Sequence, residues 1–390
     1  MRILHLAFAY LASRPLLTAL NVAMLALGVA TISFLLVVTH QAEERLTRDA
    51  KSVDLVVGAK GSPLQLILST VFHADVPTGN IGLEESRPIA ANPMVASATP
   101  VALGDSFHGH RIVGTDETFL ALYDARLAQG RMFAAEMEAI VGADVARREG
   151  LAVGAKLTGA HGLTASGPAH GDHPYEVVGI LAPTGTVADR LVITSVESVW
   201  HVHAEHAPAR PEITALLLRY RTPLAAAMLP RAINSTTAMQ AASPAYESAR
   251  LLDLVGVGVE TLQWFAIVLM ASAALSLFVA LTSALQERRY DLALLRTLGA
   301  RPAALAALTL AEGVTLLLAG VILGFALGHG AAHALGWWLA GAASWPVTGL
   351  TWAPGEAVLA AAVLAFGALT CLAPAWQAYF RDPASLLARR

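Results

Sequence analysis

The chain has 390 residues, of which 55% are apolar and only 14% charged, and its mean hydropathy of +0.56 excludes an ordinary soluble protein. The net charge of −3 leaves no basic excess for nucleic-acid binding. Residues 41–255 hold 17 Lys/Arg and 23 Asp/Glu, whereas the rest of the chain holds nine Arg and six acids, which predicts a large polar domain inserted into a membrane protein.

Four apolar segments are long enough to cross a membrane as helices. The first, Leu16–Thr39, has 24 uncharged residues and would be about 36 Å long, against a hydrocarbon core of about 30 Å. It exceeds the roughly 7–15-residue core of a signal peptide, and no A-x-A site follows, so we expect an uncleaved span. The other three predicted spans are Gly256–Leu285, Ala303–Gly330 and Gly355–Gln377.

The polar domain is predicted to be mixed α/β. Its Gly58–Ile81 segment is apolar and helix-like, and it either covers the core or presents a surface to a partner. Gly162–Pro174 and Ala204–Pro211 have the composition of polar loops. The pattern of apolar residues indicates a helical stalk over Glu43–Ser52, strands over Val53–Gly58, Tyr175–Leu181, Arg190–Thr194 and Ile213–Tyr220, and a strand followed by a helix over Ala139–Arg148.

Histidine is concentrated in the polar domain, where ten of the thirteen lie within residues 40–255. His108 and His110 would share a face if they lie on a strand. Closely spaced imidazoles can supply ligands to zinc or copper, and the alternative is a hydrophilic loop in which histidine is one tolerated polar residue. The candidate metal ligands are His170, His173, His201, His203 and His206, and the sequence does not assign them to one site.

Between the second and third spans lies a short arginine-rich segment, Gln286–Arg301, with the sequence QERRYDLALLRTLGAR. Leu292, Leu295 and Leu298 recur every third residue, so an amphipathic helix would carry one apolar ridge beside its arginines. Such a helix is suited to a groove on a soluble partner. The alternative is a charged hairpin that only anchors the two spans.

Acidic residues are rare in the spans. Glu260 and Glu356 lie near the outer ends of theirs, whereas Glu312 lies about nine residues, or about 14 Å, into the third span. A charge at that depth costs about 2.5–3.5 kcal/mol on insertion scales, so Glu312 is expected to face protein or to be protonated. The same span carries Gly320, Gly324 and Gly328, a double G-x-x-x-G pattern suited to close helix packing within the subunit or across a dimer.

The placement of arginine predicts the orientation of the chain. All basic residues outside residues 41–255 precede the first span, lie between the second and third, or follow the fourth, and the loop Ala331–Pro354 has no Lys or Arg. The positive-inside rule makes this basic side cytoplasmic. Residues 41–255 are therefore expected outside the cytoplasm. Cys371 is the sole cysteine, so the polar domain has no internal disulfide.

Three segments resemble one protein family. They are the loop sequence ERRYDLALLRTLGA, the stretch LAQGRMFAAEMEAIVGADVARREGLAVGAKL (Leu127–Leu157) and the carboxyl end PAWQAYFRDPASLLARR. All three are similar to FtsX-like ABC transporter permeases, the group that includes the macrolide exporter MacB and the lipoprotein-releasing permeases. The resemblance implies four transmembrane helices in a one-plus-three arrangement, with a large mixed α/β extracytoplasmic domain inserted after the first.

In this family the loop is the coupling helix, which contacts the ATP-hydrolysing subunit. The resemblance implies that role for Glu287, Arg288, Arg289, Asp291, Leu292, Leu295, Arg296, Leu298 and Gly299, and Asp291 replaces the usual glutamate. The chain itself is expected to be non-catalytic, because its three lysines all follow alanine and no Gly-Lys-Ser/Thr motif can form. ATP and magnesium would bind the partner, and no cofactor is expected here apart from the open zinc alternative.

The expected segments follow from these observations. They are a cytoplasmic start and first span (1–40), the MacB-like periplasmic domain (41–255), the second span (256–285), the coupling helix (286–302), the third span (303–335), a periplasmic loop (336–354), the fourth span (355–377) and a cytoplasmic tail (378–390).

The expected setting is a bacterial inner membrane, with the permease as a homodimer or a heterodimer with a paralogue. Its expected partners are membrane lipids, a cytoplasmic ABC ATP-binding subunit and a periplasmic adaptor or substrate-binding protein. Three functions remain open at this point: mechanical export or extraction of a substrate, a zinc-related permease, and a signalling or hydrolase-regulating protein that moves no substrate.

Overall fold

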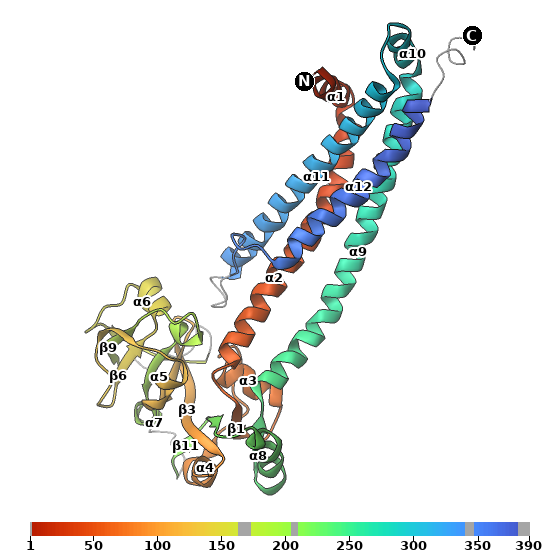
Figure 1. Ribbon diagram of the computed structural model, residues 1–390. Helices are drawn as coiled ribbons and strands as arrows, with labels where there is room; N and C mark the ends of the chain where they lie inside the picture. Colours follow the sequence, from red (N-terminus) through yellow and green to blue (C-terminus); the bar gives the residue numbers. More distant parts are fainter. Residues whose placement is uncertain (1, 163–172, 204–209, 340–346, 381–390) are drawn as a thin grey trace. The chain divides into compact units, whose positions relative to one another are not determined.

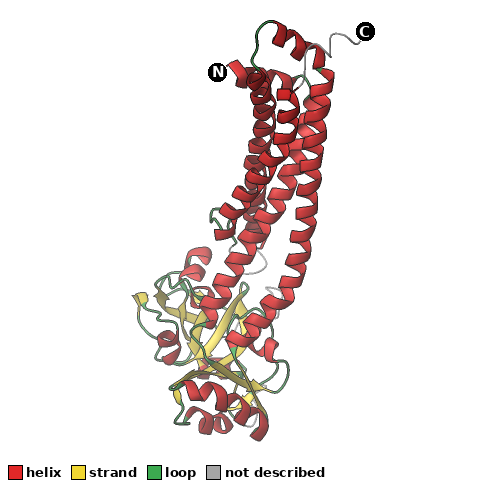
Figure 2. Ribbon diagram, turned by 45° about the vertical axis from the view of Figure 1, so that its right-hand side comes forward, coloured by secondary structure: helices red, strands yellow, loops and turns green. Residues whose placement is uncertain are grey.

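The computed structural model describes residues 2–162, 173–203, 210–339 and 347–380. The chain forms two compact units. A helical unit contains the described residues up to Gln41 and those from Gly256 onward, and an α/β unit contains residues 42–255. Figures 1 and 2 show the long helices side by side in the helical unit and the strands gathered in the α/β unit.

The long helices are α2 (Pro15–Ala50), α9 (Pro244–Glu287), α11 (Pro302–Leu339) and α12 (Pro354–Phe380). All four are long and apolar enough to span a membrane, and α2 lies near the N-terminus, which confirms the predicted one-plus-three arrangement. Each begins at a proline. The N–H groups in the first turn of a helix have no acceptor within the helix, so a proline there costs no hydrogen bond. Their facing side chains form one apolar core that includes Leu25, Val29, Leu277, Leu316 and Val363.

All four long helices extend beyond the predicted spans, and α2 and α9 extend furthest. The helix α2 continues to Ala50, as the helical pattern of Glu43–Ser52 indicated, and α9 begins twelve residues before Gly256. The reason is that apolar composition marks only the part of a helix in contact with lipid, whereas the backbone remains helical through amphipathic sequence on either side. Two short helices, α1 (Arg2–Ala12) and α10 (Arg289–Thr297), lie at one end of the helical unit (Figure 1).

The α/β unit is built on one mixed sheet with the strand order β13-β1-β12-β3-β4-β10-β6-β9-β5 among the described residues, where β8 also pairs with β3 and β7 with β9. Most neighbours are antiparallel, and β10–β4 and β6–β9 are parallel. The strands are β1 (Leu55–Ala59), β3 (Val95–Phe107), β4 (His110–Thr115), β5 (Leu127–Gly130), β6 (Glu138–Val141), β7 (Lys156–Leu157), β8 (Ala160–His161), β9 (Tyr175–Leu181), β10 (Val192–Ser195), β12 (Ala215–Tyr220) and β13 (Met239–Ala242).

Helices and two apolar cores complete this unit. One core lies around β1, β12 and β3, and the other around β4, β6, β9 and β10. The helices are α3 (Pro63–Thr70), α4 (Leu83–Ala90), α5 (Thr118–Leu122), α6 (Ala143–Glu149), α7 (Val196–Val202), α8 (Pro223–Thr236) and the 3-10 helix η1 (Val187–Arg190). Leu66 and Ile67 of α3 are buried, so this part of the apolar Gly58–Ile81 segment covers the core and is not a partner surface.

One local prediction is wrong in part, and the condition stated for another is not met. The predicted strand Ile213–Tyr220 is divided, because β11 (Glu212–Ile213) pairs with β2 (Ile81–Gly82) and only β12 joins the main sheet. His108 lies in the β3–β4 turn with φ 48°, so it does not share a strand face with His110. The turn forms because Gly109 adopts φ 84°, a conformation that favours glycine.

Candidate functional site

The arginine-rich loop forms a short helix between α9 and α11. Arg288 occupies the N-cap of α10, and Leu298 follows its last turn. Gly299 then adopts φ 96°, and the Ala300 amide donates to the Leu295 carbonyl at 2.9 Å. This is the usual way to end a helix with a left-handed residue, and it turns the chain into α11.

One side of the loop is fixed to the helical unit by charge. Arg288 donates a hydrogen bond from Nη1 to Glu312 Oε1 of α11 at 2.8 Å, and its guanidinium lies 3.7 Å from the centre of the Tyr10 ring of α1. The two side chains of the pair are only 13% and 7% exposed. Next to them, Glu287 forms an ion pair with Arg14. Arg288 therefore joins α1, α10 and α11 at one point.

Leu295 fixes the same side by packing. Its half-buried side chain contacts a small core formed by Leu285 of α9, Leu305 of α11 and Ala378 of α12. A displacement of α10 would consequently press on three of the four long helices.

The other side of α10 exposes an apolar stripe. Tyr290, Leu294 and Leu298 are 66%, 49% and 77% exposed and follow each other at four-residue spacing, so they lie on one face of the helix. The predicted single ridge of Leu292, Leu295 and Leu298 is wrong, because Leu295 faces inward and Leu298 outward. The side chains of Arg289, Asp291 and Leu292 lie outside the described part of the structure, and Arg296 is half-buried.

The glycines of α11 lie against α2. A Cβ at Gly320 would lie 2.6 Å from Leu25, one at Gly324 2.6 Å from Val29, and one at Gly328 2.9 Å from the Ala30 carbonyl oxygen. The G-x-x-x-G face therefore packs within the subunit, where it lets two helix backbones approach closely.

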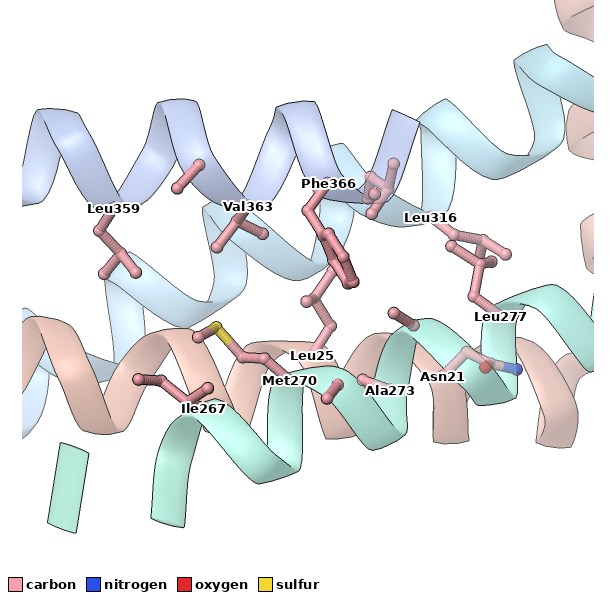
Figure 3. A pocket seen from close by; sticks show the side chains of 15 residues that line it. Asn21, Leu25, Ile267, Met270, Ala273, Leu277, Leu316, Leu359, Val363 and Phe366 are labelled. Atoms are coloured by element: carbon pink, nitrogen blue, oxygen red, sulfur yellow. The ribbon is translucent and has the colours of Figure 1, made fainter. Parts of the chain in front are cut away.

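A cavity of about 270 Å³ lies among α2, α9, α11 and α12. Its lining is apolar apart from Asn21, whose amide donates to the Leu17 carbonyl at 2.8 Å (Figure 3). Met270 and Phe366 point into it from α9 and α12. Such a lining suits an acyl chain or a change in helix packing and offers a polar solute almost no hydrogen-bonding groups.

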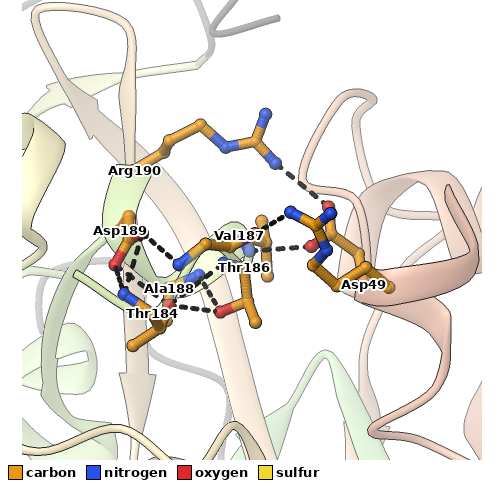
Figure 4. Close-up of polar contacts among 9 residues, drawn as sticks. Asp49, Thr184, Thr186, Val187, Ala188, Asp189 and Arg190 are labelled. Atoms are coloured by element: carbon orange, nitrogen blue, oxygen red, sulfur yellow. Dashed lines mark hydrogen bonds and ion pairs between the residues drawn. The ribbon is translucent and has the colours of Figure 1, made fainter. Parts of the chain in front are cut away.

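The far end of α2 has a polar attachment inside the α/β unit. Asp49 is buried, accepts a hydrogen bond from the Val187 amide at 2.9 Å and pairs with Arg190 Nη2 at 3.2 Å (Figure 4). Asp189 fixes the preceding turn by accepting from the amides of Thr184 and Gly185. The last turn of α2 is thus bonded to η1, which leads directly into β10.

The three predicted metal ligands that the structure describes, His173, His201 and His203, do not form one group. His201 pairs with Glu136 at 3.2 Å and lies edge-on to His173, whereas His203 pairs with Asp105 at 3.5 Å and lies near His161. His170 and His206 lie outside the described residues. Sequence reasoning missed Asp105 and His161, because only the β3–β8 register brings them together.

Four apolar helices and an inserted α/β domain define a multi-pass membrane protein. The MacB-like periplasmic core domain family matches residues 18–242, and the FtsX-like permease C-terminal family matches residues 264–383. The chain therefore belongs to the MacB/FtsX-type permeases of ABC transporters, as the sequence motifs indicated.

Two solved structures are similar to part of the chain. The periplasmic region of MacB from Actinobacillus actinomycetemcomitans is 10% identical, with 53% of this chain and 95% of that chain covered and a TM-score of 0.36. The extracellular domain of the noncanonic ABC-type transporter YknZ from Gram-positive bacteria is 12% identical, with 48% and 98% covered and a TM-score of 0.32. No curated protein matches the sequence.

Proposed function

We propose that this permease transmits the ATP-driven motion of a separate cytoplasmic ABC ATPase to its α/β domain, and that this motion exports or extracts a substrate. The observation that carries the proposal is the two-sided helix α10. Its outer face exposes Tyr290, Leu294 and Leu298, and its inner face is bonded through Arg288 and packed through Leu295. An exposed apolar helix face is suited to a groove on a partner protein.

The proposed path of motion runs from α10 to the α/β domain, and specific side-chain contacts hold both of its ends. At α10, Arg288 and Leu295 connect the loop to the long helices. At the last turn of α2, Asp49 is bonded to η1. Because α2 and α9 are continuous helices of 36 and 44 residues, the proposed displacement would pass along them. The apolar cavity among the helices gives no support to conduction of a polar solute, which favours work done at the α/β domain.

The remaining parts of the proposal concern the setting. The arginines outside the α/β domain support a cytoplasmic position for α10 in a bacterial inner membrane and a periplasmic position for the α/β domain. The active form is proposed to be a dimer that binds two ATPase subunits, with an adaptor or substrate-binding protein on the periplasmic side. The permease itself would perform no chemistry.

The test separates partner binding from transmission. With an ABC ATP-binding subunit identified from the neighbouring genes, Leu298→Glu is expected to weaken its binding at least about tenfold, the equivalent of about 1.4 kcal/mol. Thr297→Glu is the matched control, because it adds the same charge on the same helix beside the stripe. Leu295→Ala is expected to retain ATPase binding but to lose the coupling between hydrolysis and substrate movement.

Binding by microscale thermophoresis and ATP hydrolysis in reconstituted vesicles give the two readouts. Unchanged binding of the Leu298→Glu variant would show that the exposed stripe is not the ATPase contact. ATP hydrolysis that the permease stimulates but that is accompanied by no substrate movement would instead identify a signalling or hydrolase-regulating protein.

A further inference from the structure

We propose that Asp105, His161 and His203 form a binding site for one divalent transition-metal ion, of which zinc is the best match. The three residues come from β3, β8 and the C-cap of α7, and each offers a ligand atom within 4.8 Å of the other two. Two imidazoles and one carboxylate are the ligand types that zinc takes in three-residue sites. This inference is independent of the ATPase-coupling proposal.

Backbone pairing positions two of the ligands. Asp105 and His161 are direct cross-strand partners in the antiparallel pair of β3 and β8. The distance from His161 Nδ1 to Asp105 Oδ1 is 3.2 Å. Asp105 is only 2% exposed, although it lies on the sheet. A carboxylate buried to this degree is costly unless it faces cations or hydrogen-bond donors, and these two imidazoles, or a metal between them, meet that requirement.

The third ligand is held in the tautomer that metal binding needs. His203 Nδ1 lies 2.9 Å from the Val199 carbonyl oxygen, which can only accept a hydrogen bond, so Nδ1 carries the proton. In the neutral ring, Nε2 is then the atom with the lone pair, and it lies 3.5 Å from Asp105 Oδ1. Metal-bound histidines usually donate their second N–H to a carbonyl or carboxylate in this way.

The distances from Asp105 to the two imidazoles agree with a tetrahedral ion. Metal–ligand bonds of about 2.1 Å place neighbouring ligand atoms about 3.4 Å apart, close to the 3.2 and 3.5 Å observed here. Gly104 adds room, because a Cβ there would lie 3.3 Å from His203 Cε1. The same distances also fit protonated histidines paired with a carboxylate, so metal titration has to separate the two states.

One of the three ligands, His203, borders a cavity. A cavity of about 380 Å³ is lined by His203 together with Asn80, Trp200, Arg210, Glu212 and Thr214. An ion could enter through it, and a water or a substrate group could take the fourth position, as in zinc sites with three protein ligands. The chemical class of ligand is therefore a divalent metal ion, free or carried by a small donor molecule.

The experiment titrates zinc into the full-length, metal-stripped permease, purified in detergent without a polyhistidine tag. A chromophoric chelator competes for the zinc, and Co²⁺ in place of zinc reports the geometry by its visible absorption. The wild type is expected to bind one zinc per chain tightly and to give the intense bands of four-coordinate cobalt. Asp105→Asn, His161→Ala and His203→Ala are each expected to lower the affinity for this zinc ion. The loss should exceed the roughly 10–100-fold that removal of a supporting residue costs.

His201→Ala is the matched control, because it removes an exposed imidazole two residues from His203 that contacts Glu136. It is expected to retain the tight zinc and the cobalt spectrum. His161 is 44% exposed, so its variant is expected to fold even if the variant at buried Asp105 does not, and thermal unfolding checks each protein. Absence of a tight equivalent in the wild type, unchanged affinity in the His161→Ala and His203→Ala variants, or loss of the site in His201→Ala alone would overturn the proposal.

Discussion

At the scale of single residues, Arg288 and Glu312 show how a charge is accommodated in an apolar helix unit. Glu312 lies well inside α11, and its carboxylate accepts a hydrogen bond from the guanidinium of Arg288, which also stacks on Tyr10. The sequence indicated that Glu312 must face protein, because an isolated charge there is costly. The sequence did not indicate that Arg288 is the partner, since 24 residues separate Arg288 from Glu312 along the chain.

This pair predicts a non-additive effect on stability. Arg288→Ala or Glu312→Ala leaves the opposite charge buried and unpaired, so each single variant is expected to lose about 3–5 kcal/mol. The double variant Arg288→Met with Glu312→Leu is expected to recover most of that loss, because it removes both charges and keeps the volume. Thermal unfolding in detergent, read as a double-mutant cycle, measures the coupling. Single losses that simply add in the double variant would show that the two side chains do not interact.

A second residue-scale prediction concerns His73 of the α/β domain. Burial, together with the charges of Arg111 and Arg190, lowers its pKa to about 3. Below about pH 6.5 the unfolded chain therefore takes up a proton that the folded chain does not. The free energy of unfolding keeps its full value above that pH and decreases as the pH falls towards 3. From pH 7 to pH 5 the loss is about 2 kcal/mol.

Replacing His73 by Asn is expected to remove this part of the pH dependence. Asn suits the left-handed backbone at this position, where φ is 53°. Thermal unfolding at pH 7 and pH 5 gives the measurement, and His201→Ala provides a control that removes an exposed imidazole from the same domain. If the wild type and the His73→Asn variant lost equal stability between pH 7 and pH 5, the titrating group would be another residue.

At the scale of elements, the glycines of α11 decide how closely it approaches α2. Ala is normally favoured over Gly inside a helix by about 1 kcal/mol. At Gly330 nothing lies within 4 Å of an added Cβ, whereas at Gly324 the Cβ would meet Val29 at 2.6 Å and the Ala26 carbonyl oxygen at 3.0 Å. The same substitution at two positions of one helix therefore has opposite expected signs.

Gly324→Ala is expected to destabilise the helical unit by about 1–3 kcal/mol, because the added methyl forces two backbones apart. Gly330→Ala serves as the matched control and is expected to be neutral or slightly stabilising. Thermal unfolding of both variants in the same detergent makes the comparison. A Gly324→Ala variant as stable as the control would mean that α2 and α11 do not approach as closely as the structure shows.

Sequence reasoning was reliable for elements and weaker for contacts. Apolar length predicted all four spans, and the short apolar run Tyr175–Leu181 predicted β9 to the residue, because both signals are local. The outward face of α10 was assigned wrongly, since leucine spacing alone cannot show that Leu295 faces inward and Leu298 outward. Glu356 was placed near the outer end of its span, and its burial was not predicted.

The contacts of Glu356 show why its burial could not be predicted from the sequence. Its carboxylate accepts hydrogen bonds from Ser33 Oγ at 2.5 Å and from the Ala353 amide at 2.9 Å, and it lies 2.9 Å from His329 Nε2. Ser33 is 323 residues away along the chain. A partner so distant is fixed by helix packing, which no local pattern records. The Asp105–His161 pair was missed for the same reason, because strand register decides it.

At the scale of the whole molecule, the proposed transmission of motion from a cytoplasmic ATPase to a periplasmic domain requires α10 and the α/β domain to lie on opposite sides of the membrane. The buried Cys371 is the sole cysteine, so a Cys371→Ala background gives a chain without thiols. Leu224 of α8 and Leu298 after α10 are 60% and 77% exposed, which makes them accessible positions for single cysteines.

A membrane-impermeant maleimide is expected to label Leu224→Cys in intact spheroplasts and Leu298→Cys only after the membrane is permeabilised. The physical reason is that arginine flanks every membrane-spanning helix on the side of α10, whereas a large domain is translocated regardless of its own charge. Labelling both positions after permeabilisation controls for accessibility. If Leu298→Cys were labelled in intact cells and Leu224→Cys were not, α10 would face away from any cytoplasmic ATPase, and a mechanism driven by ATP hydrolysis through this helix would be impossible.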